Sequence, residues 1–219
     1  MAEAAIKVKN VWKRFKLYND VIIEVVHPFF DVERFIKVNA NLSASNVVFV
    51  GTHWPTKGIL FLPKIFKLVR KEVRDVKFYV LGSKTRYTPW LRKMSLTMDG
   101  FYVIGYRRPE LYFKQSCILL HPAIYDAFPV VVLEAMAAGL IPIISDRTGS
   151  AEILKEYYGK LVLRLDPELI SEKIIDILTM SLDEKVELSQ KIRKKALNPL
   201  FRKEFSINKF RKSFIKILR

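Results

Sequence analysis

A chain of 219 residues, half of them hydrophobic and 27% charged, can bury a full core, which excludes intrinsic disorder as its main state. Its one cysteine permits no internal disulfide and suits a reducing interior, and no run of about 18 uncharged apolar residues could span a membrane. The net charge of +16 predicts attraction to polyanions, namely nucleic acid, anionic lipid or phosphorylated small molecules, although a solvated, lysine-rich surface explains the charge equally well.

Short apolar runs rich in β-branched or aromatic residues recur along the chain and predict strands. They lie at residues 21–26, 46–50, 77–81, 101–104, 117–120 and 140–144. Apolar residues at a helical period predict helices over residues 59–73, 130–138 and 167–180. Strands that alternate with helices and are almost continuously apolar indicate a parallel sheet covered on both faces. The predicted fold class is therefore α/β, a Rossmann-like, doubly wound parallel sheet.

The chain is predicted to have three segments. Residues 1–20 form a lead-in helix or linker, residues 21–200 form the Rossmann-like domain, and residues 201–219 form a basic amphipathic helix. A helix that begins at Ser206 places five apolar residues along one face: Ile207, Phe210, Phe214, Ile217 and Leu218. Such a helix either covers a core or lies on an anionic membrane surface.

Ligands bind beyond the carboxyl ends of the strands in such a sheet, so the loops at those ends are the place to look for chemistry. The loop VFVGTHWPTKG carries Gly51, Thr52 and Lys57 between a strand and a helix. It does not have the glycine and hydroxyl order of a phosphate-binding P-loop, which disfavours a magnesium-dependent NTPase. On its residues alone, this first loop is better explained as a plain strand–helix turn with a solvated lysine. VLGSK with Gly82 is explained equally well as a plain turn or as a place where a ligand approaches the backbone.

The third loop, in LLHPAIYDAFPVVVLEAMAAG, carries Asp126 and Phe128 and leads through Pro129 into a helix. The amides at that helix start have the geometry and the positive dipole end that suit a phosphate. Glu134 lies about one turn farther along, inside an apolar run, where it either accepts the two hydroxyls of a ribose or is bound by backbone amides or a lysine. The residues alone leave these two interpretations open.

The order of VGTHWPTKG, VKFYVLGS and YVIGYRRPELYFKQSCILLHPAIYDAFPVVVLEAMAAG resembles the donor-binding, C-terminal half of the retaining GT-B glycosyltransferases of family 4, the glycosyl transferases of group 1. The narrowest signature is an acidic residue, seven intervening positions, then Glu followed by AMAAG. VVHPFFDVERF looks like the interdomain connection of that family, and FSINKF resembles its closing helix. The resemblance implies a hexosyltransferase whose substrate is a UDP-, GDP- or ADP-sugar and which requires no metal and no other cofactor.

The resemblance also implies roles for individual positions. Asp126, Glu134 and Lys57 are the candidate catalytic residues: Asp126 contacts the transferred sugar, Glu134 the ribose and Lys57 the diphosphate. Tyr106 lines the base pocket. The other candidate binding residues are the loop residues Gly51, Thr52 and Gly82 and the helix start at Phe128, Val130 and Val131.

Two residues depart from the pattern of that family. Thr52 stands where the family has an arginine, so one cation facing the diphosphate is lost, with Arg86, Arg107 and His53 as candidate substitutes. Asp126 stands where the family has a glutamate and is shorter by one bond, about 1.5 Å.

The acceptor-binding half of the family is absent from the sequence. The partner predicted for this chain is therefore a second chain or domain that supplies that half, and the natural acceptor is not defined by the sequence. An anionic membrane surface is a further candidate partner, and the predicted location is cytoplasmic, with peripheral contact at the inner membrane face as an extension.

Other functions stay open. A non-catalytic nucleotide-sugar-binding subunit is one alternative. A basic nucleic-acid-binding protein is another, but the basic residues are spread along the chain and no recognition motif is present. Three histidines and one cysteine give no metal-ligand spacing, and His27 and His121, each before a proline, are predicted to pack in turns.

Overall fold

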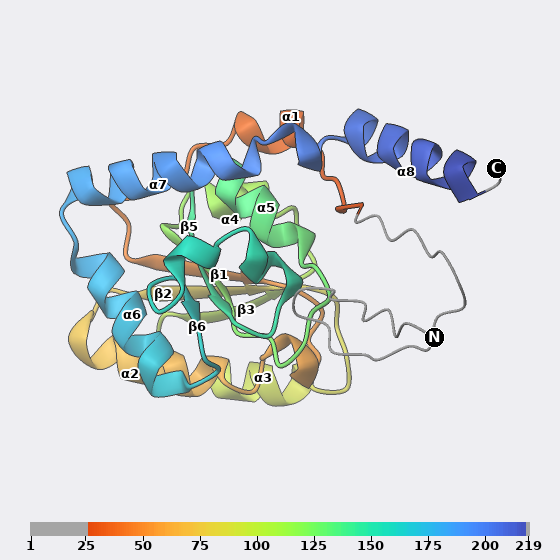
Figure 1. Cartoon of the computed structure of the whole chain (residues 1–219). Helices are drawn as coiled ribbons and strands as arrows, with labels where there is room; N and C mark the ends of the chain where they lie inside the picture. The colour runs from red at the N-terminus through yellow and green to blue at the C-terminus, as the bar shows by residue number, and fades with distance from the viewer. Residues whose placement is uncertain (1–25, 218–219) are drawn as a thin grey trace, which may run out of the picture.

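Six parallel strands form a single sheet in the computed structural model of the protein, which describes residues 26–217 (Figure 1). The strands are β1 (Asn46–Val50), β2 (Lys77–Leu81), β3 (Phe101–Gly105), β4 (Ile118–His121), β5 (Ile141–Ser145) and β6 (Val162–Leu163). Their spatial order is β3-β2-β1-β4-β5-β6, and every neighbouring pair is parallel. Residues of β4 and β5 are buried throughout, as expected for central strands covered on both faces.

Helices cover both faces of this sheet. The α-helices are α1 (Val32–Ile36), α2 (Leu62–Glu72), α3 (Thr88–Ser95), α4 (Glu110–Phe113), α5 (Val130–Ala137), α6 (Pro167–Thr179), α7 (Leu182–Ala196) and α8 (Lys203–Ile217). Short 3-10 helices are η1 (Pro55–Lys57), η2 (Gly149–Glu152), η3 (Lys155–Tyr157) and η4 (Pro199–Phe201). In Figure 1, α2, α3 and α6 lie against one face, and α1, α4, α5 and α7 lie against the other.

Local sequence explains where helices α6 and α7 begin. Asp166 caps α6, with one carboxylate oxygen accepting from the amides of Glu168 and Leu169, and Pro167 occupies the first turn. Helix α7 begins with a capping box, in which the Ser181 hydroxyl accepts from the Glu184 amide and the Glu184 carboxylate accepts from the Ser181 amide.

The predicted fold class is confirmed, with differences at the element boundaries. Strands β4 and β5 each begin and end one residue later than predicted. The strand predicted at residues 21–26 falls outside the described residues except for Val26, which is not in a strand. The short elements α1, α4 and β6, and the helices α3 and α7, were not predicted. Tertiary packing stabilises elements as short as α1, α4 and β6, so their local pattern is weak.

Helix α8 begins at Lys203, two residues into the segment predicted at 201–219 and three residues before Ser206, and it leads away from the sheet (Figure 1). The Ser206 hydroxyl, buried at the start of the helix, donates to the His27 carbonyl oxygen at 3.0 Å. Farther along, the Phe210 side chain is 59% exposed, so it does not cover a core. Contact between α8 and an anionic membrane stays a prediction, and residues 1–20 and Leu218 lie outside the described part of the chain.

The strand order places a topological switch point between β1 and β4. From β1 the chain passes to α2 on one face and pairs outward with β2, whereas from β4 it passes to α5 on the other face and pairs outward with β5. In open α/β sheets the ligand site lies at such a point, beyond the carboxyl ends of the two strands.

The loops that follow β1 and β4 are packed directly against each other. The amides of Ile124 and Tyr125 both donate to the Thr56 carbonyl oxygen, at 2.8 and 3.3 Å. Gly58 has φ +85°, and a Cβ there would lie 1.9 Å from the Pro122 carbonyl oxygen. Glycine at position 58 therefore serves both the left-handed turn and the close approach of the second loop.

We expect Gly58→Ala to destabilise the fold by about 3 kcal/mol, because it adds a backbone collision to the cost of a left-handed residue. Gly159→Ala is the matched control, since Gly159 has φ +76° but a Cβ added there would have no atom within 4 Å. The control should lose only about 1 kcal/mol. Urea unfolding of the two variants measures both values, and equal losses would contradict the proposed close approach.

Candidate functional site

Lys57 and Asp126 meet between the loops that follow β1 and β4. Lys57 ends η1, and its Nζ lies 2.6 Å from Oδ2 of Asp126. The Asp126 side chain is only 12% exposed and that of Lys57 29%, so the ion pair is largely shielded from water. The structure thus joins two predicted site residues that are 69 positions apart in sequence.

His121, the last residue of β4, donates to the same carboxylate. Its Nε2 lies 3.1 Å from Oδ2 of Asp126, and its side chain is 2% exposed. Burial of Asp126 opposes ionisation, but the hydrogen bonds from His121 and Lys57 outweigh burial and hold the pKa of the Asp126 carboxyl below its ordinary value. Asp126 is therefore an ionised carboxylate bound by two donors at neutral pH. The prediction that His121 simply packs in a turn was incomplete.

The backbone of Asp126 is fixed by the loop that follows β5. Its amide donates to the Arg147 carbonyl oxygen at 3.4 Å, and its own carbonyl oxygen accepts from the Gly149 amide at 2.9 Å. Asp126, itself in the loop after β4, is thus held by the loops after β1 and β5. Its carboxylate has a defined place although it lies outside any strand or helix.

Helix α5 begins immediately after this cluster. Pro129 occupies the N-cap position, and the Val132 amide donates to its carbonyl oxygen at 3.0 Å. The preceding amides of Val130 and Val131 have no acceptor among the residues that the structure describes, so they are free to bind an anion. Phe128 instead packs its ring near His27 and Phe201, with ring centroids 5.8 and 6.4 Å away. Its side chain supports the loop rather than lining an open surface.

Glu134 is the unpaired carboxylate of the site. Within the described residues it has no hydrogen-bond or ion-pair partner, so neither backbone amides nor a lysine bind it. Burial is the largest influence on its ionisation, and the attraction of Arg34 only partly offsets burial and the repulsion of Glu110 and Asp31. Together these raise the pKa of Glu134 to about 7. An unpaired, part-buried carboxylate with a raised pKa is typical of functional sites.

Arg34, the cation that lowers the pKa of Glu134, is itself bound to another carboxylate. Arg34 of α1 donates from Nε and Nη2 to the two oxygens of Glu110, at 2.5 and 2.8 Å, and Arg108 adds a contact of 3.2 Å. The hydrogen bond from Arg34 outweighs burial and lowers the pKa of Glu110 to about 2. This forked pair fastens the segment before β1 to the start of α4.

The glycine turn after β1 packs against the turn after β2. A Cβ at Gly82 would lie 1.6 Å from the Gly51 carbonyl oxygen, so this glycine allows two backbones to approach each other. Thr52 follows Gly51 and is partly exposed at the same end of the sheet. Beside it, His53 is fully buried against the Thr88 hydroxyl, and burial, followed by the charge of Arg92, lowers its pKa. His53 therefore does not supply the cation missing at position 52.

The other two candidate substitutes lie on the surface. Arg86 stacks over the rings of Trp54 and Tyr87, at 5.8 and 5.2 Å from their centroids. Arg107 donates to the Tyr106 carbonyl oxygen at 2.8 Å, and the Tyr106 ring just after β3 is 77% exposed. Neither arginine contacts the Lys57–Asp126 pair.

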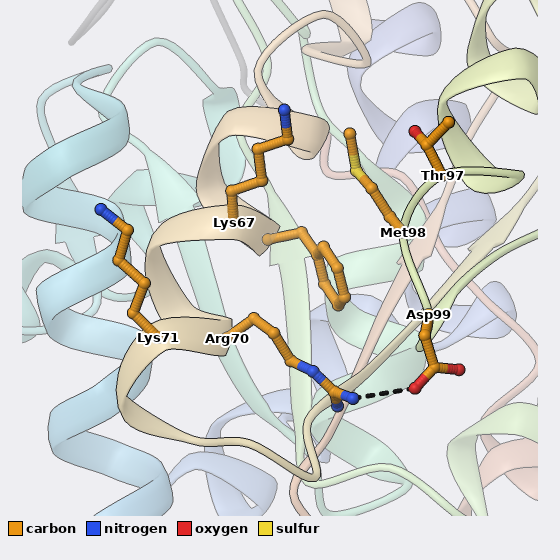
Figure 2. A pocket seen from close by; sticks show the side chains of 7 residues that line it. Lys67, Arg70, Lys71, Thr97, Met98 and Asp99 are labelled. Carbon is orange, nitrogen blue, oxygen red and sulfur yellow. Dashed lines mark hydrogen bonds and ion pairs between the residues drawn. The ribbon is translucent and has the colours of Figure 1, made fainter.

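A separate hollow of about 320 Å³ lies at the opposite edge of the sheet, near the amino ends of β2 and β3. Figure 2 shows Arg70 turned toward Asp99, with Nη2 2.9 Å from Oδ2, while Lys67 and Lys71 extend away from this pair. Its one closely placed arginine is already neutralised, so the hollow is a weak candidate for an anion site.

Residues 26–217 offer neither a metal cluster nor a membrane-spanning helix. Across this range no three His, Cys, Asp or Glu side chains gather in a way that could hold a metal ion. Within the same part of the chain, every helix is too short or too polar to cross a membrane.

Comparison with known proteins establishes the family. The glycosyl transferases group 1 family matches residues 44–180, more than half of the chain, and the chain belongs to it. An uncharacterized glycosyltransferase of Methanocaldococcus jannaschii is 26% identical over 203 residues, which cover 80% of this chain and 50% of the relative. The chain thus spans about half the length of that curated relative.

Solved structures share the fold at low sequence identity. A mutant of S. aureus TarM, solved in complex with UDP among other ligands, is 17% identical with a TM-score of 0.75, over 90% of this chain and 40% of that one. Sucrose-phosphate synthase of Thermosynechococcus elongatus is also 17% identical, with a TM-score of 0.72, over 89% of this chain and 52% of that one. These structural neighbours are GT-B glycosyltransferases, and at such identities the likeness establishes the fold alone.

Two contacts at the site were not predicted from the sequence. The bond between His121 and Asp126 spans five residues across a turn, and the pair Arg34–Glu110 spans 76. The first had a signal, a histidine at the end of a strand shortly before an acidic residue. The second had none, because nothing local links the two positions.

The Arg34–Glu110 pair should make stability depend on acid pH. Because the pKa of Glu110 is about 2 in the folded chain and ordinary when unfolded, its contribution is complete above about pH 5 and is lost as the pH falls toward 2. We expect Glu110→Gln to remove about 2 kcal/mol of stability at pH 7 and much less at pH 3. Urea unfolding at the two pH values measures this difference.

The matched control is Asp99→Asn, which breaks an ion pair whose carboxylate is 87% exposed. An exposed pair contributes about 0 to 1 kcal/mol, so this variant should unfold nearly like the wild type. A loss for Glu110→Gln that is the same at pH 3 and pH 7 would contradict the assigned pair.

Proposed function

We propose that this chain is the donor-binding, C-terminal half of a retaining glycosyltransferase of family 4 that uses a nucleotide diphosphate sugar and needs no metal. The observation that carries the proposal is the contact between Lys57 and Asp126 at the switch point between β1 and β4. It places a cation for a diphosphate and a carboxylate for a sugar together, at the edge of the sheet where this fold binds ligands.

The other site residues bind the successive parts of the nucleotide sugar, from the base to the diphosphate. Tyr106, exposed after β3, receives the base, and Glu134 receives the ribose. The charge of Glu110, which lies four residues after Tyr106 in sequence, contributes to the raised pKa of Glu134. This contribution supports a site in which the base and the ribose lie on the same side. The amides of Val130 and Val131 then meet the diphosphate, and Lys57 lies on its far side.

The reaction transfers the sugar and releases a nucleoside diphosphate. The negative charge that develops on the leaving diphosphate is stabilised by the Lys57 ammonium and by the amides at the start of α5, which are fixed before the reaction begins. Asp126 accepts a hydrogen bond from a hydroxyl of the transferred sugar and so orients the sugar ring. Gly51, Thr52 and Gly82 form the floor beneath the diphosphate, with Thr52 offering a neutral hydroxyl in place of a second cation.

The acceptor is bound outside this donor-binding half of the enzyme. The chain covers 50% of its curated relative and 40 to 52% of the two solved neighbours described above, and all three are longer proteins. A second domain or a second chain therefore supplies the acceptor side. Donor binding can be tested without it, because every proposed donor residue lies on this chain.

Calorimetric titration of the purified chain tests the donor site directly. We expect one nucleotide among UDP, GDP and ADP, and its glucose or mannose ester, to bind in the micromolar range with equal affinity in magnesium and in EDTA. Failure of all of them to bind saturably would overturn the proposal. Binding that requires magnesium would overturn its metal-independent part.

Two variants then test the residue roles. Lys57→Ala should weaken the nucleoside diphosphate about tenfold to a hundredfold but leave the nucleoside unchanged, because one charge-assisted contact to phosphate is lost. Glu134→Ala should weaken both, because both carry the ribose. Lys67→Ala, at the remote hollow of Figure 2, is the control and should bind like the wild type. Equal affinities for the wild type and Glu134→Ala would refute the ribose assignment.

The raised pKa of Glu134 predicts that donor binding depends on pH. A ribose hydroxyl donates to the ionised carboxylate, and with a pKa of about 7 Glu134 is mostly protonated at pH 6 and mostly ionised at pH 8. Affinity for the nucleotide sugar, whose phosphates do not titrate in this range, should therefore rise about tenfold from pH 6 to pH 8. Glu134→Gln should bind weakly and equally at both; a wild type that is insensitive to pH would contradict the assignment.

A further inference from the structure

The Asp126 carboxylate is bound asymmetrically. Lys57 Nζ and His121 Nε2 both contact Oδ2, at 2.6 and 3.1 Å. Oδ1 has no partner within the described residues, and the side chain keeps 12% of its surface exposed. One oxygen is therefore fully engaged, while the other is available to a ligand.

The protonation of His121 follows from its contacts. A carboxylate oxygen only accepts hydrogen bonds, so the short contact requires a proton on Nε2. The other ring nitrogen, Nδ1, is buried and has no partner in the described part of the chain. Nε2 is therefore the ring nitrogen whose proton has an acceptor, whereas a proton on Nδ1 would have none among the described residues.

We propose that His121 is a positioning residue for the donor sugar: it holds Asp126 by Oδ2, leaves Oδ1 for a sugar hydroxyl, and keeps this hold when the donor diphosphate draws Lys57 away. This inference rests on the proposed function and deepens it. A diphosphate that contacts the Lys57 ammonium weakens its bond to Asp126, because the two anions then share one positive charge.

His121 suits this task because the sheet holds it in place. It ends a central strand whose four residues are all buried, and its Cα is paired in register with Ile144 of β5. Lys57 reaches Asp126 through a flexible side chain that is 29% exposed. When the nucleotide sugar binds, the buried imidazole of His121 still donates to Asp126 after the Lys57 side chain has turned to the diphosphate. The Asp126 carboxylate therefore keeps its direction.

The test is the affinity ratio between a nucleoside diphosphate sugar and the corresponding nucleoside diphosphate, measured by calorimetry. His121→Leu removes the hydrogen-bond donor to Asp126 but keeps an apolar side chain of similar bulk. We expect it to lower this ratio about fivefold or more while the nucleoside diphosphate binds nearly as before. His121→Gln should restore most of the ratio, because its amide nitrogen can take the place of Nε2. His53→Gln, at the other fully buried histidine, should leave the ratio unchanged.

The outcomes separate the inference from the function on which it rests. Absence of nucleotide-sugar binding in the wild type would overturn both. Wild-type binding with an unchanged ratio in His121→Leu would overturn the inference alone. Equal losses for both ligands in the leucine and glutamine variants, with a lowered Tm, would show a purely structural role and overturn it as well.

A measurement without ligand gives an independent readout. Nitrogen NMR of the imidazole rings distinguishes the three histidines of the chain once His121→Gln has identified one signal. We expect His121 in the free protein to carry a proton on Nε2, the nitrogen that contacts Asp126. A proton on Nδ1 alone would overturn the inference, whatever the affinities.

Discussion

The contact between the loops that follow β1 and β4 is the constraint on which the site depends. Its backbone part joins the Thr56 carbonyl oxygen to two amides of the second loop, and its side-chain part is the bond from Lys57 to Asp126. Because β1 and β4 are neighbours in the sheet but send their helices to opposite faces, the loops after these two strands meet at the carboxyl edge, at the switch point of the sheet. The position of both charged residues thus follows from the strand order.

Charge at this end of the molecule is distributed so that one carboxylate stays unpaired. Arg34 is committed to Glu110, and Lys57 and His121 are committed to Asp126, which leaves Glu134 without a close cation in the described structure. Burying an unpaired carboxylate is unfavourable, and a purely structural residue at this position would gain by being apolar. The protein therefore retains a destabilising group where a polar ligand can satisfy it.

The overall net charge was a poor guide to this site. The +16 charge predicted a polyanion partner in general terms, but at this end of the molecule the important cations are Arg34 and Lys57, and each is paired with a largely buried carboxylate. The basic hollow near Lys67 and Lys71 shows the contrast, because cations there extend separately from the surface. Recognition of a diphosphate depends on cations and amides that converge on one place, a property that composition does not contain.

The amino-acid sequence alone was enough to predict the doubly wound class, the strands β1 to β5 to within a residue and the helices α2, α5 and α6, because apolar runs and helical periods are local properties of the chain. It also singled out Lys57, Asp126 and Glu134 as residues of interest. The three-dimensional fold was needed to show that Lys57 and His121 contact the same oxygen of Asp126, that Arg34 pairs with Glu110 and that His53 is buried. Such contacts join residues up to 76 positions apart, and their partners are chosen by the order in which strands pair, which no local pattern records.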